Sequence, residues 1–215
     1  MISHHHRTVF IHIPKCGGQS VEQAFLEDLG LDWARRAPLL LRPNDHPGLG
    51  PPYLAHLLAR DYVGYRYLTE AQFDEYFKFA VVRCPYARYV SLYNYTEYRW
   101  GRRRFVDRFL RGQFAGDGAR AGRGWPRRRD LHYFVRPQSD FLEDEEGRRI
   151  VDCVIKLERL SDDFEDARRR SGLRAPLRHR NASTRRMTVD DLQTFEREAV
   201  RELYARDFER LGYDT

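Results

Sequence analysis

The most constraining feature of this sequence is a short stretch near its start in which one periodicity gives way to another. Residues 8–13 alternate between two sets of side chains, as a β-strand does, and residues 14–19 interrupt that pattern with two adjacent glycines. Over residues 20–29 the apolar side chains return at helical spacing. The stretch therefore predicts a strand, a tight loop and a helix, which is the building unit of an α/β fold.

Both ends of the predicted helix carry recognisable signals. Ser20 and Gln23 have the S-x-x-Q spacing of a capping box, in which each residue satisfies a backbone N–H of the first turn. Gly30 stands where a glycine commonly terminates a helix. We therefore expect the helix to begin near Ser20 and to end before Gly30.

The loop between the strand and the helix has the character of an anion site. A glycine-rich turn that enters a helix presents free backbone N–H groups and the positive end of the helix dipole, which suit a phosphate-like group. Only three of the 38 Lys and Arg residues are lysines, and Lys15 stands in this loop. This rarity favours a functional role for a compact ammonium in the loop. The alternative is a loop with no ligand, because two glycines between a strand and a helix also occur without one.

A second informative stretch covers residues 77–100. Residues 77–82 form a nearly continuous apolar run, which is typical of a parallel strand that is buried on both faces. Arg83 follows it, and Pro85 suits the first turn of a helix that contains Ser91. Arg83 at the end of a central strand is expected in the ligand crevice, or in an ion pair with a helix carboxylate. Ser91 is either a ligand donor or a hydroxyl bonded to the preceding turn.

These two stretches resemble the two signatures of a known family. The loop P-K-C-G-G-Q-S and the run F-x-F-A-x-V-R-x-P-Y-x-R-x-V-S-x-Y are similar to those of sulfotransferases that use 3′-phosphoadenosine 5′-phosphosulfate. The run F-V-R-P-Q-S-D-F-L (residues 134–142), the later H-R-N-A-S and the closing R-D-F-E-R-L-G-Y resemble the carbohydrate branch of that family, which includes heparan 2-O-sulfotransferases. The resemblance covers most of the chain.

The resemblance implies a fold and a set of site residues. The fold is α/β, with a P-loop-like central parallel sheet of about four to five strands flanked by helices. The donor would be bound by Lys15, Cys16, Gly17, Gly18, Gln19, Ser20, Arg83 and Ser91. In this scheme the loop binds the 5′-phosphosulfate, while Arg83 and Ser91 bind the 3′-phosphate. Lys15 also counts as catalytic, because it faces the charge that develops on the leaving group. No metal is expected, since the sequence has no carboxylate motif for magnesium.

Sulfuryl transfer to a hydroxyl also needs a base. The resemblance indicates His56, which matches in position a histidine of the carbohydrate branch, and histidine titrates near neutral pH. His12 is a rival, but its place in the strand favours packing against a helix. His132 and His179 lie in later predicted loops. A neighbouring glutamate or aspartate is a further candidate for the base.

The remaining sequence predicts further elements around these two stretches. They are a loop over residues 31–52, a short helix over 53–61, a T-x-x-Q capping box at Thr69 and Gln72, a helix over 105–114, a glycine- and arginine-rich loop over 116–129, a buried strand over 150–157, a helix over 161–170 with Ser161 as cap and Gly172 as stop, a basic loop over 173–186, and one or two helices over 188–211.

Length and composition predict a single domain over residues 1–215. Three scattered cysteines indicate neither a disulfide framework nor a zinc site and favour a reducing compartment. The sequence shows no signal peptide and no run of the ~20 apolar residues that span a membrane, so we expect a cytoplasmic protein. The N-terminus is expected to be frayed, with His4, His5 and His6 idle.

The function predicted from these residues is transfer of a sulfuryl group to a hydroxyl of a small-molecule or glycan acceptor, with no nucleic-acid partner. The alternative is a basic nucleotide- or nucleic-acid-binding protein, which the net charge of +6 and the arginine runs 102–104 and 127–129 favour. A kinase is disfavoured because Lys15 precedes both glycines, whereas the Walker A lysine follows them.

Overall fold

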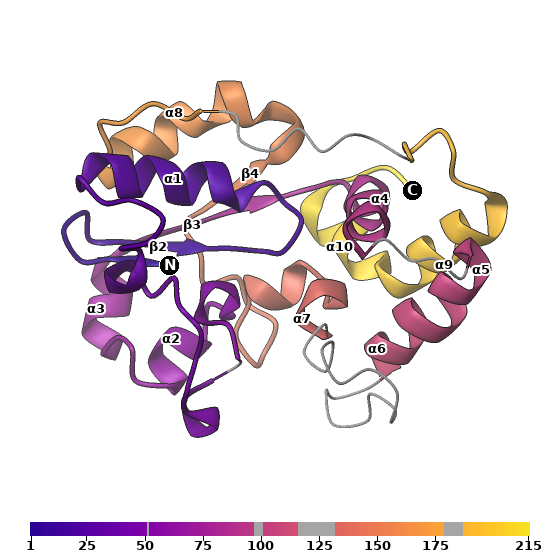
Figure 1. Ribbon diagram of the computed structural model, residues 1–215, viewed down its shortest axis with the longest axis horizontal. Coiled ribbons are helices and arrows are strands. Elements are labelled where there is room, and N and C mark those ends of the chain that lie inside the picture. The colour runs from indigo at the N-terminus through magenta and orange to yellow at the C-terminus, as the bar shows by residue number, and fades with distance from the viewer. Residues whose placement is uncertain (51, 97–100, 116–131, 179–186) are drawn as a thin grey trace. The chain divides into compact units, whose positions relative to one another are not determined.

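A mostly parallel sheet organises the first part of the chain (Figure 1). The computed structural model describes residues 1–50, 52–96, 101–115, 132–178 and 187–215. Its four strands lie in the order β1-β2-β3-β4, namely β1 (Ile2–Ser3), β2 (Thr8–Ile11), β3 (Phe77–Val82) and β4 (Cys153–Lys156). Strands β2, β3 and β4 are parallel, and β1 is antiparallel to β2. The predicted α/β class with about four to five strands is confirmed.

Helices connect and flank these strands. The α-helices are α1 (Gly18–Asp28), α2 (Asp61–Gly64), α3 (Glu70–Glu75), α4 (Pro85–Thr96), α5 (Arg102–Arg104), α6 (Arg111–Ala115), α7 (His132–Val135), α8 (Leu160–Ser171), α9 (Thr194–Leu203) and α10 (Ala205–Leu211). Short 3₁₀ turns cover Ala37–Leu39, Pro47–Leu49, Leu54–His56, Ser139–Phe141 and Leu157–Arg159, and one π-helical segment covers Phe105–Leu110.

The chain divides into two compact units. The first comprises Met1–Val82 and Asp140–Asn181, and the second comprises Arg83–Ser139 and Ala182–Thr215. The first unit holds the sheet, and the second is built from helices. The single domain over residues 1–215 stays a prediction.

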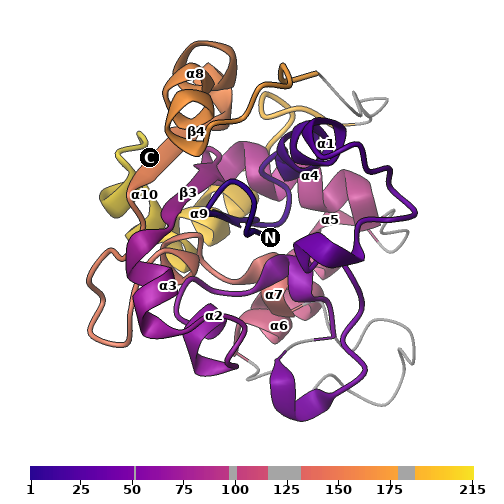
Figure 2. The ribbon, with the colours of Figure 1, turned by 90° about the vertical axis from the view of Figure 1, so that its left-hand side faces the viewer.

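The core of the first unit is formed by the sheet and the helices on its two faces. Helices α1 and α8 cover one face, while α2 and α3 lie on the other side (Figures 1 and 2). Phe10 of β2 and Phe79 of β3 are fully buried with ring centroids 5.0 Å apart, and Phe25 of α1 and Phe164 of α8 pack onto Phe79. Because helices cover both faces, every residue of β2 is buried, as in other parallel sheets.

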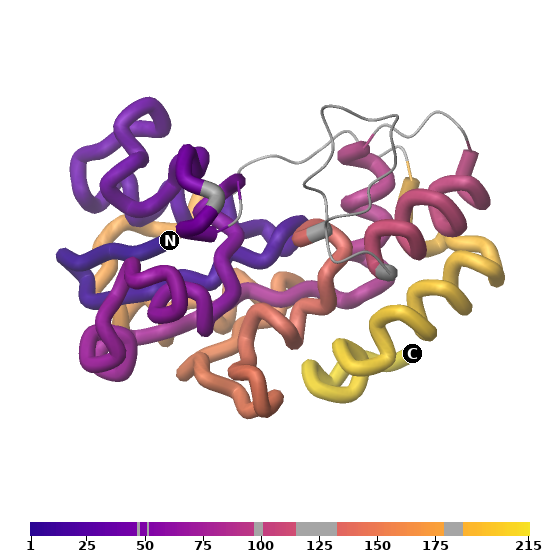
Figure 3. Tube along the Cα trace, turned by 90° about the horizontal axis from the view of Figure 1, so that it is seen from below, coloured from indigo at the N-terminus to yellow at the C-terminus, as the bar shows by residue number. Residues whose placement is uncertain are grey.

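The second unit has a separate aromatic core among its helices. Helix α4 packs against α9, and α9 leads directly into α10 (Figure 3). Phe105 of the π-helical segment is fully buried against Tyr89 of α4. The Tyr89 hydroxyl donates to the Glu196 carboxylate at 2.8 Å. Burial and then this hydrogen bond raise the pKa of Tyr89, so its hydroxyl stays protonated as a donor.

Most predicted elements are found where the sequence placed them. Strand β3 covers residues 77–82 as predicted, and Pro85 is the first residue of α4. The Thr69–Gln72 capping box has both of its hydrogen bonds. Gly172 ends α8 in the left-handed conformation. The strand predicted over 150–157 is shorter, and the glycine- and arginine-rich loop over 116–129 lies outside the described residues.

Two predicted helix caps are wrong. Helix α1 begins at Gly18 rather than near Ser20, because Gly17 adopts a left-handed conformation that lets the helix start within the loop. Ser20 is therefore the third residue of the helix. Helix α8 likewise begins one residue before Ser161, and its N-cap is Arg159.

The continuous helix predicted over residues 53–61 is also wrong. Only a 3₁₀ turn forms at Leu54–His56, after which Leu57 is extended. The next backbone donors find partners outside a helix, because the Leu58 N–H bonds to the Asp61 carboxylate and the Ala59 N–H bonds to the carbonyl of Phe141. Apolar spacing alone could not reveal these competing acceptors.

The first residues of the chain are ordered rather than frayed. Strand β1 pairs with β2, and the side chain of Met1 is buried in the core of the first unit. His6, which was expected to be idle, pairs through Nε2 with Asp28 of α1 at 2.9 Å and bonds through Nδ1 to the Ser3 hydroxyl at 2.7 Å. A terminal strand that is tied into the sheet explains why the expectation failed.

Candidate active site

The loop between β2 and α1 has the backbone of an anion site. Lys15 and Gly17 both have left-handed backbones, with φ of 69° and 78°. A left-handed lysine is uncommon and strained, and strain of this kind concentrates at functional sites. Helix α1 starts immediately after Gly17, so the N–H groups of its first turn and the positive end of its dipole open at this loop.

Gly17 is required by its left-handed backbone, and Gly18 by the His12 ring beside it. A Cβ atom on Gly17 would lie 2.7 Å from Cδ1 of Leu157. A Cβ atom on Gly18 would lie 2.5 Å from Nε2 and 2.8 Å from Cγ of His12, which are distances that no real Cβ tolerates. The start of α1 therefore packs directly on Leu157, the residue after β4, and on His12, the residue after β2.

The His12 ring that meets Gly18 is fixed by a buried carboxylate. His12 Nδ1 donates to Oε1 of Glu22 at 2.6 Å, and both side chains are buried. The ring cannot turn away from Gly18 without breaking this pair. His12 therefore packs against a helix, as the sequence predicted, and links the end of β2 to the second turn of α1.

The other side chains of the loop divide into buried and accessible ones. Cys16 is buried, and its thiol donates to the carbonyl of Pro14 at 3.6 Å. Ser20 is buried, Lys15 is partly buried and Gln19 is exposed. Cys16 and Ser20 thus shape the loop from inside, while Lys15 and Gln19 reach the surface.

His56 is anchored to the residue that leads into this loop. Its Nδ1 lies 2.9 Å from the carbonyl oxygen of His12, and the two rings are 4.6 Å apart at an angle of 62°. A carbonyl can only accept, so Nδ1 carries the proton, and in the neutral ring Nε2 carries the lone pair. The structure thereby places His12, Gly18, Glu22 and His56 together, with His56 in the tautomer that a general base acting through Nε2 requires.

Arg83 directly follows the last residue of β3. Strands β2 and β3 are parallel neighbours, so their carboxyl ends lie at the same edge of the sheet. The Arg83 backbone is bonded on both sides to the Gln138 side chain: its N–H donates to Oε1 at 2.8 Å, and its carbonyl accepts from Nε2 at 2.8 Å.

Ser91 lies in the second turn of α4 and is partly exposed, whereas its neighbours Val90 and Leu92 are buried. It therefore stands on the outer face of α4 within the second unit. Arg83 and Ser91 belong to that unit, and the Lys15 loop and His56 belong to the first. His132 lies in α7, and His179 lies outside the described residues.

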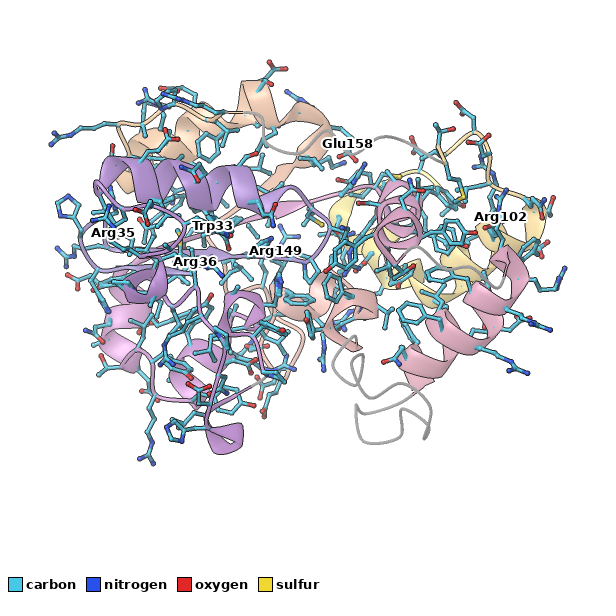
Figure 4. The ribbon with its side chains drawn as sticks, in the orientation of Figure 1. Trp33, Arg35, Arg36, Arg102, Arg149 and Glu158 are labelled. Atoms are coloured by element: carbon cyan, nitrogen blue, oxygen red, sulfur yellow. The ribbon has the colours of Figure 1, made fainter. Side chains whose placement is uncertain are left out.

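A surface segment that follows α1 is held in place by its own side chains. The Arg36 guanidinium lies 4.8 Å from the centre of the Trp33 ring and donates to the carbonyls of Trp33 and Leu41 (Figure 4). Asp32 accepts from the backbone of Ala34 and Arg35. Part of the predicted loop over residues 31–52 is thus a defined structure near the start of the segment.

The described residues hold no group of three or more His, Cys, Asp or Glu side chains arranged to bind a metal ion. Within the same part of the chain, no helix combines the length and apolarity that crossing a membrane requires.

A model of the sulfotransferase family matches residues 1–214, which is nearly the whole chain. The chain belongs to the sulfotransferase family. Comparisons with curated proteins and with solved structures return no match. Family membership makes the protein an enzyme of sulfuryl transfer, and the α/β sheet with flanking helices agrees with the P-loop-like fold that the resemblance implied.

Two residues of this sulfotransferase that sequence reasoning missed are Glu22 and Gln138. Glu22 stands between Val21 and Ala24 on the buried face of α1, and a charge on an apolar helical face is a signal of a buried partner. Gln138 lies in the run F-V-R-P-Q-S-D-F-L, which drew attention only through its resemblance. Its partner Arg83 is 55 residues away, so no local pattern could have connected them.

Proposed function

We propose that this sulfotransferase moves a sulfuryl group from 3′-phosphoadenosine 5′-phosphosulfate to a hydroxyl of a carbohydrate acceptor. The observation that carries the proposal is the loop in which Lys15 and Gly17 have left-handed backbones, Gly18 packs against the His12 ring, and the N-terminus of α1 begins. This loop suits the 5′-phosphosulfate. Arg83 and Ser91 are the proposed ligands of the 3′-phosphate.

The reaction needs three contributions from the chain. The loop holds the donor so that the acceptor oxygen can attack sulfur in line with the leaving phosphate oxygen. Lys15 and the backbone N–H groups of Gly17, Gly18 and Gln19 stabilise the negative charge that develops on that oxygen, whereas the Ser20 N–H donates to the Gly17 carbonyl at 3.2 Å. The new oxygen–sulfur bond forms as the old one breaks, and 3′-phosphoadenosine 5′-phosphate leaves.

His56 is the proposed base for the acceptor proton. Its Nδ1 is held by the His12 carbonyl, so in the neutral ring Nε2 is the nitrogen that would accept the hydroxyl proton. This arrangement gives His56 a fixed orientation at the entrance to the anion loop. The Glu22 carboxylate is instead paired with His12.

The carbohydrate acceptor rests on the runs at residues 134–142 and near the C-terminus, which resemble the heparan 2-O-like branch. The alternative of a nucleic-acid-binding protein gains no support from the described arginine run. Arg102 forms an ion pair with the fully buried Glu196 (Figure 4), and Arg103 lies 4.4 Å from the centre of the Phe195 ring. Arg102 is thus partly buried and engaged within the second unit, whereas Arg103 is exposed and lies over the Phe195 ring.

Binding of the desulfated product tests the proposal. Micromolar 3′-phosphoadenosine 5′-phosphate should raise the melting temperature of the wild type, because a ligand that binds only the folded state stabilises it. Lys15→Ala should abolish the rise, whereas Lys78→Ala is the control, because Lys78 donates to the carbonyls of Phe73 and Tyr76 far from the loop in sequence. Salt-dependent binding of oligonucleotides that does not require Lys15 would instead support the alternative.

A further inference from the structure

The backbone of Arg83 is held by a buried side chain beyond the end of the sheet. The pairing of β3 with β4 ends at Val82, so the next residue lies outside the ladder. There the Gln138 amide both donates to and accepts from the Arg83 backbone, at 2.8 Å each. Gln138 is fully buried. The Gln138 side chain thereby supplies the backbone hydrogen bonds for Arg83 that a neighbouring strand supplies for β3.

Gln138 is in turn fixed by a buried carboxylate. Asp207 of α10 accepts from the backbone N–H of Gln138 at 2.8 Å and from that of Ser139 at 2.9 Å. Asp207 is fully buried, and a buried carboxylate with two backbone donors gives strong, charge-assisted hydrogen bonds. The position of Gln138 therefore depends on Asp207.

The segment that precedes Gln138 is fixed as well. The buried guanidinium of Arg88 donates to the carbonyls of Phe134 and Arg136, and the Tyr204 hydroxyl donates to that of Val135. Burial raises the pKa of Tyr204, so its hydroxyl remains a donor. Residues of α4 and of the C-terminal helices thus converge on the short segment that carries Gln138.

We infer that Gln138 and Asp207 are positioning residues that fix the Arg83 backbone so that its guanidinium is oriented for the 3′-phosphate of the donor. The inference rests on the proposed function. A guanidinium binds a phosphate best in a bidentate geometry, and a fixed backbone reduces the conformational freedom that is lost on binding. Loss of either residue should weaken recognition of the 3′-phosphate and leave recognition of the 5′-phosphate at the loop intact.

The experiment compares two probes by titration calorimetry on the full chain, well below its melting temperature. The probes are 3′-phosphoadenosine 5′-phosphate and adenosine 5′-phosphate, which lacks the 3′-phosphate. The preference of the wild type for the first probe should fall by about fivefold or more in Gln138→Met, which keeps the volume and removes both hydrogen bonds. Asp207→Asn, which keeps one acceptor, is the second variant if Gln138→Met fails to fold.

Glu196→Gln is the matched control. Glu196 is also a fully buried carboxylate of the second unit, and its donors are Tyr89 and Arg102 rather than the backbone of Gln138 and Ser139 that Asp207 binds. The control should lower the melting temperature and keep the preference between the probes.

Each outcome has a distinct meaning. If Arg83→Ala removes the preference while Gln138→Met and Asp207→Asn retain it, the inference is overturned and the proposed function stands. An equal loss in Glu196→Gln also overturns it, because general destabilisation would then explain the effect. A wild type with no preference for the 3′-phosphate overturns the proposed function itself.

Discussion

In the proposed function the Lys15 loop and the Arg83 region each fix a cation for an anionic ligand, and the two backbones are held by opposite means. The loop is held by close neighbours in the sequence, since His12 and Glu22 are 10 residues apart. The Arg83 backbone is held by Gln138, 55 residues away, which depends on Asp207, a further 69 residues along the chain. The first arrangement can form as soon as β2 and α1 meet, whereas the second requires the C-terminal helices.

The largest effect is expected on kcat, and it distinguishes the catalytic step from binding of the donor. His56→Ala should lower kcat by about 10²–10⁴-fold, because the acceptor proton loses its base. Binding of 3′-phosphoadenosine 5′-phosphate should be unchanged, whereas Arg83→Ala should weaken it. Steady-state kinetics and calorimetry on both variants check this, and a His56→Ala enzyme with normal kcat would remove His56 from the mechanism.

The next largest effect is expected on stability and concerns the buried pair of His12 and Glu22. Glu22→Ala should lower the free energy of unfolding by about 3–5 kcal/mol, because removing one partner of a buried pair leaves the other without compensation. Glu22→Gln should recover part of the loss, since its amide oxygen can still accept from His12. Urea denaturation measures both variants. Equal stability of Glu22→Ala and the wild type would show that the pair does not hold the loop.

A smaller effect tests the contact between Gly18 and the His12 ring. Gly18→Ala should cost about 1–3 kcal/mol through overpacking against a ring that Glu22 holds in place. His12→Ala should relieve the clash, so the double variant Gly18→Ala/His12→Ala should be more stable than the sum of the single effects predicts. Strict additivity in this double-mutant cycle would contradict the contact.

The smallest effect is expected for a glycine of the second unit, which serves as a reference for the Gly18→Ala substitution. Gly112 lies inside α6, its φ is ordinary, and a Cβ atom there would meet no atom within 4 Å. Gly112→Ala should therefore raise the free energy of unfolding by about 0.5–1 kcal/mol through helix propensity and lower entropy of the unfolded chain. The opposite signs at Gly18 and Gly112 would show that the cost at Gly18 comes from its surroundings rather than from the substitution.

The same contrast explains what the sequence could and could not predict. The strand, loop and helix around Lys15 and the strand before Arg83 follow from local periodicity and turn residues, and both are confirmed. The cap at Ser20 was misplaced because Gly17 could start the helix earlier, and the helix over 53–61 was interrupted by acceptors at Asp61 and Phe141. Local patterns carry no information on such acceptors when they lie far along the chain.

The sequence predicted roles for the site residues from residue type and from the order of the motifs, but it did not predict the residues that hold them in place. Histidine at position 56 was chosen through resemblance, and its anchor at the His12 carbonyl emerged only from the fold. Glu22 and Gln138 were missed, since the partners that give them meaning are set by tertiary packing.

The anchor of His56 is a main-chain atom, and this has an evolutionary consequence. Every amino acid at position 12 offers the same carbonyl oxygen, so the side chain there can be exchanged without taking away the acceptor that orients the imidazole. Divergent proteins built on this scaffold can thus change the buried histidine–glutamate contact and still keep the same orientation of the imidazole at position 56.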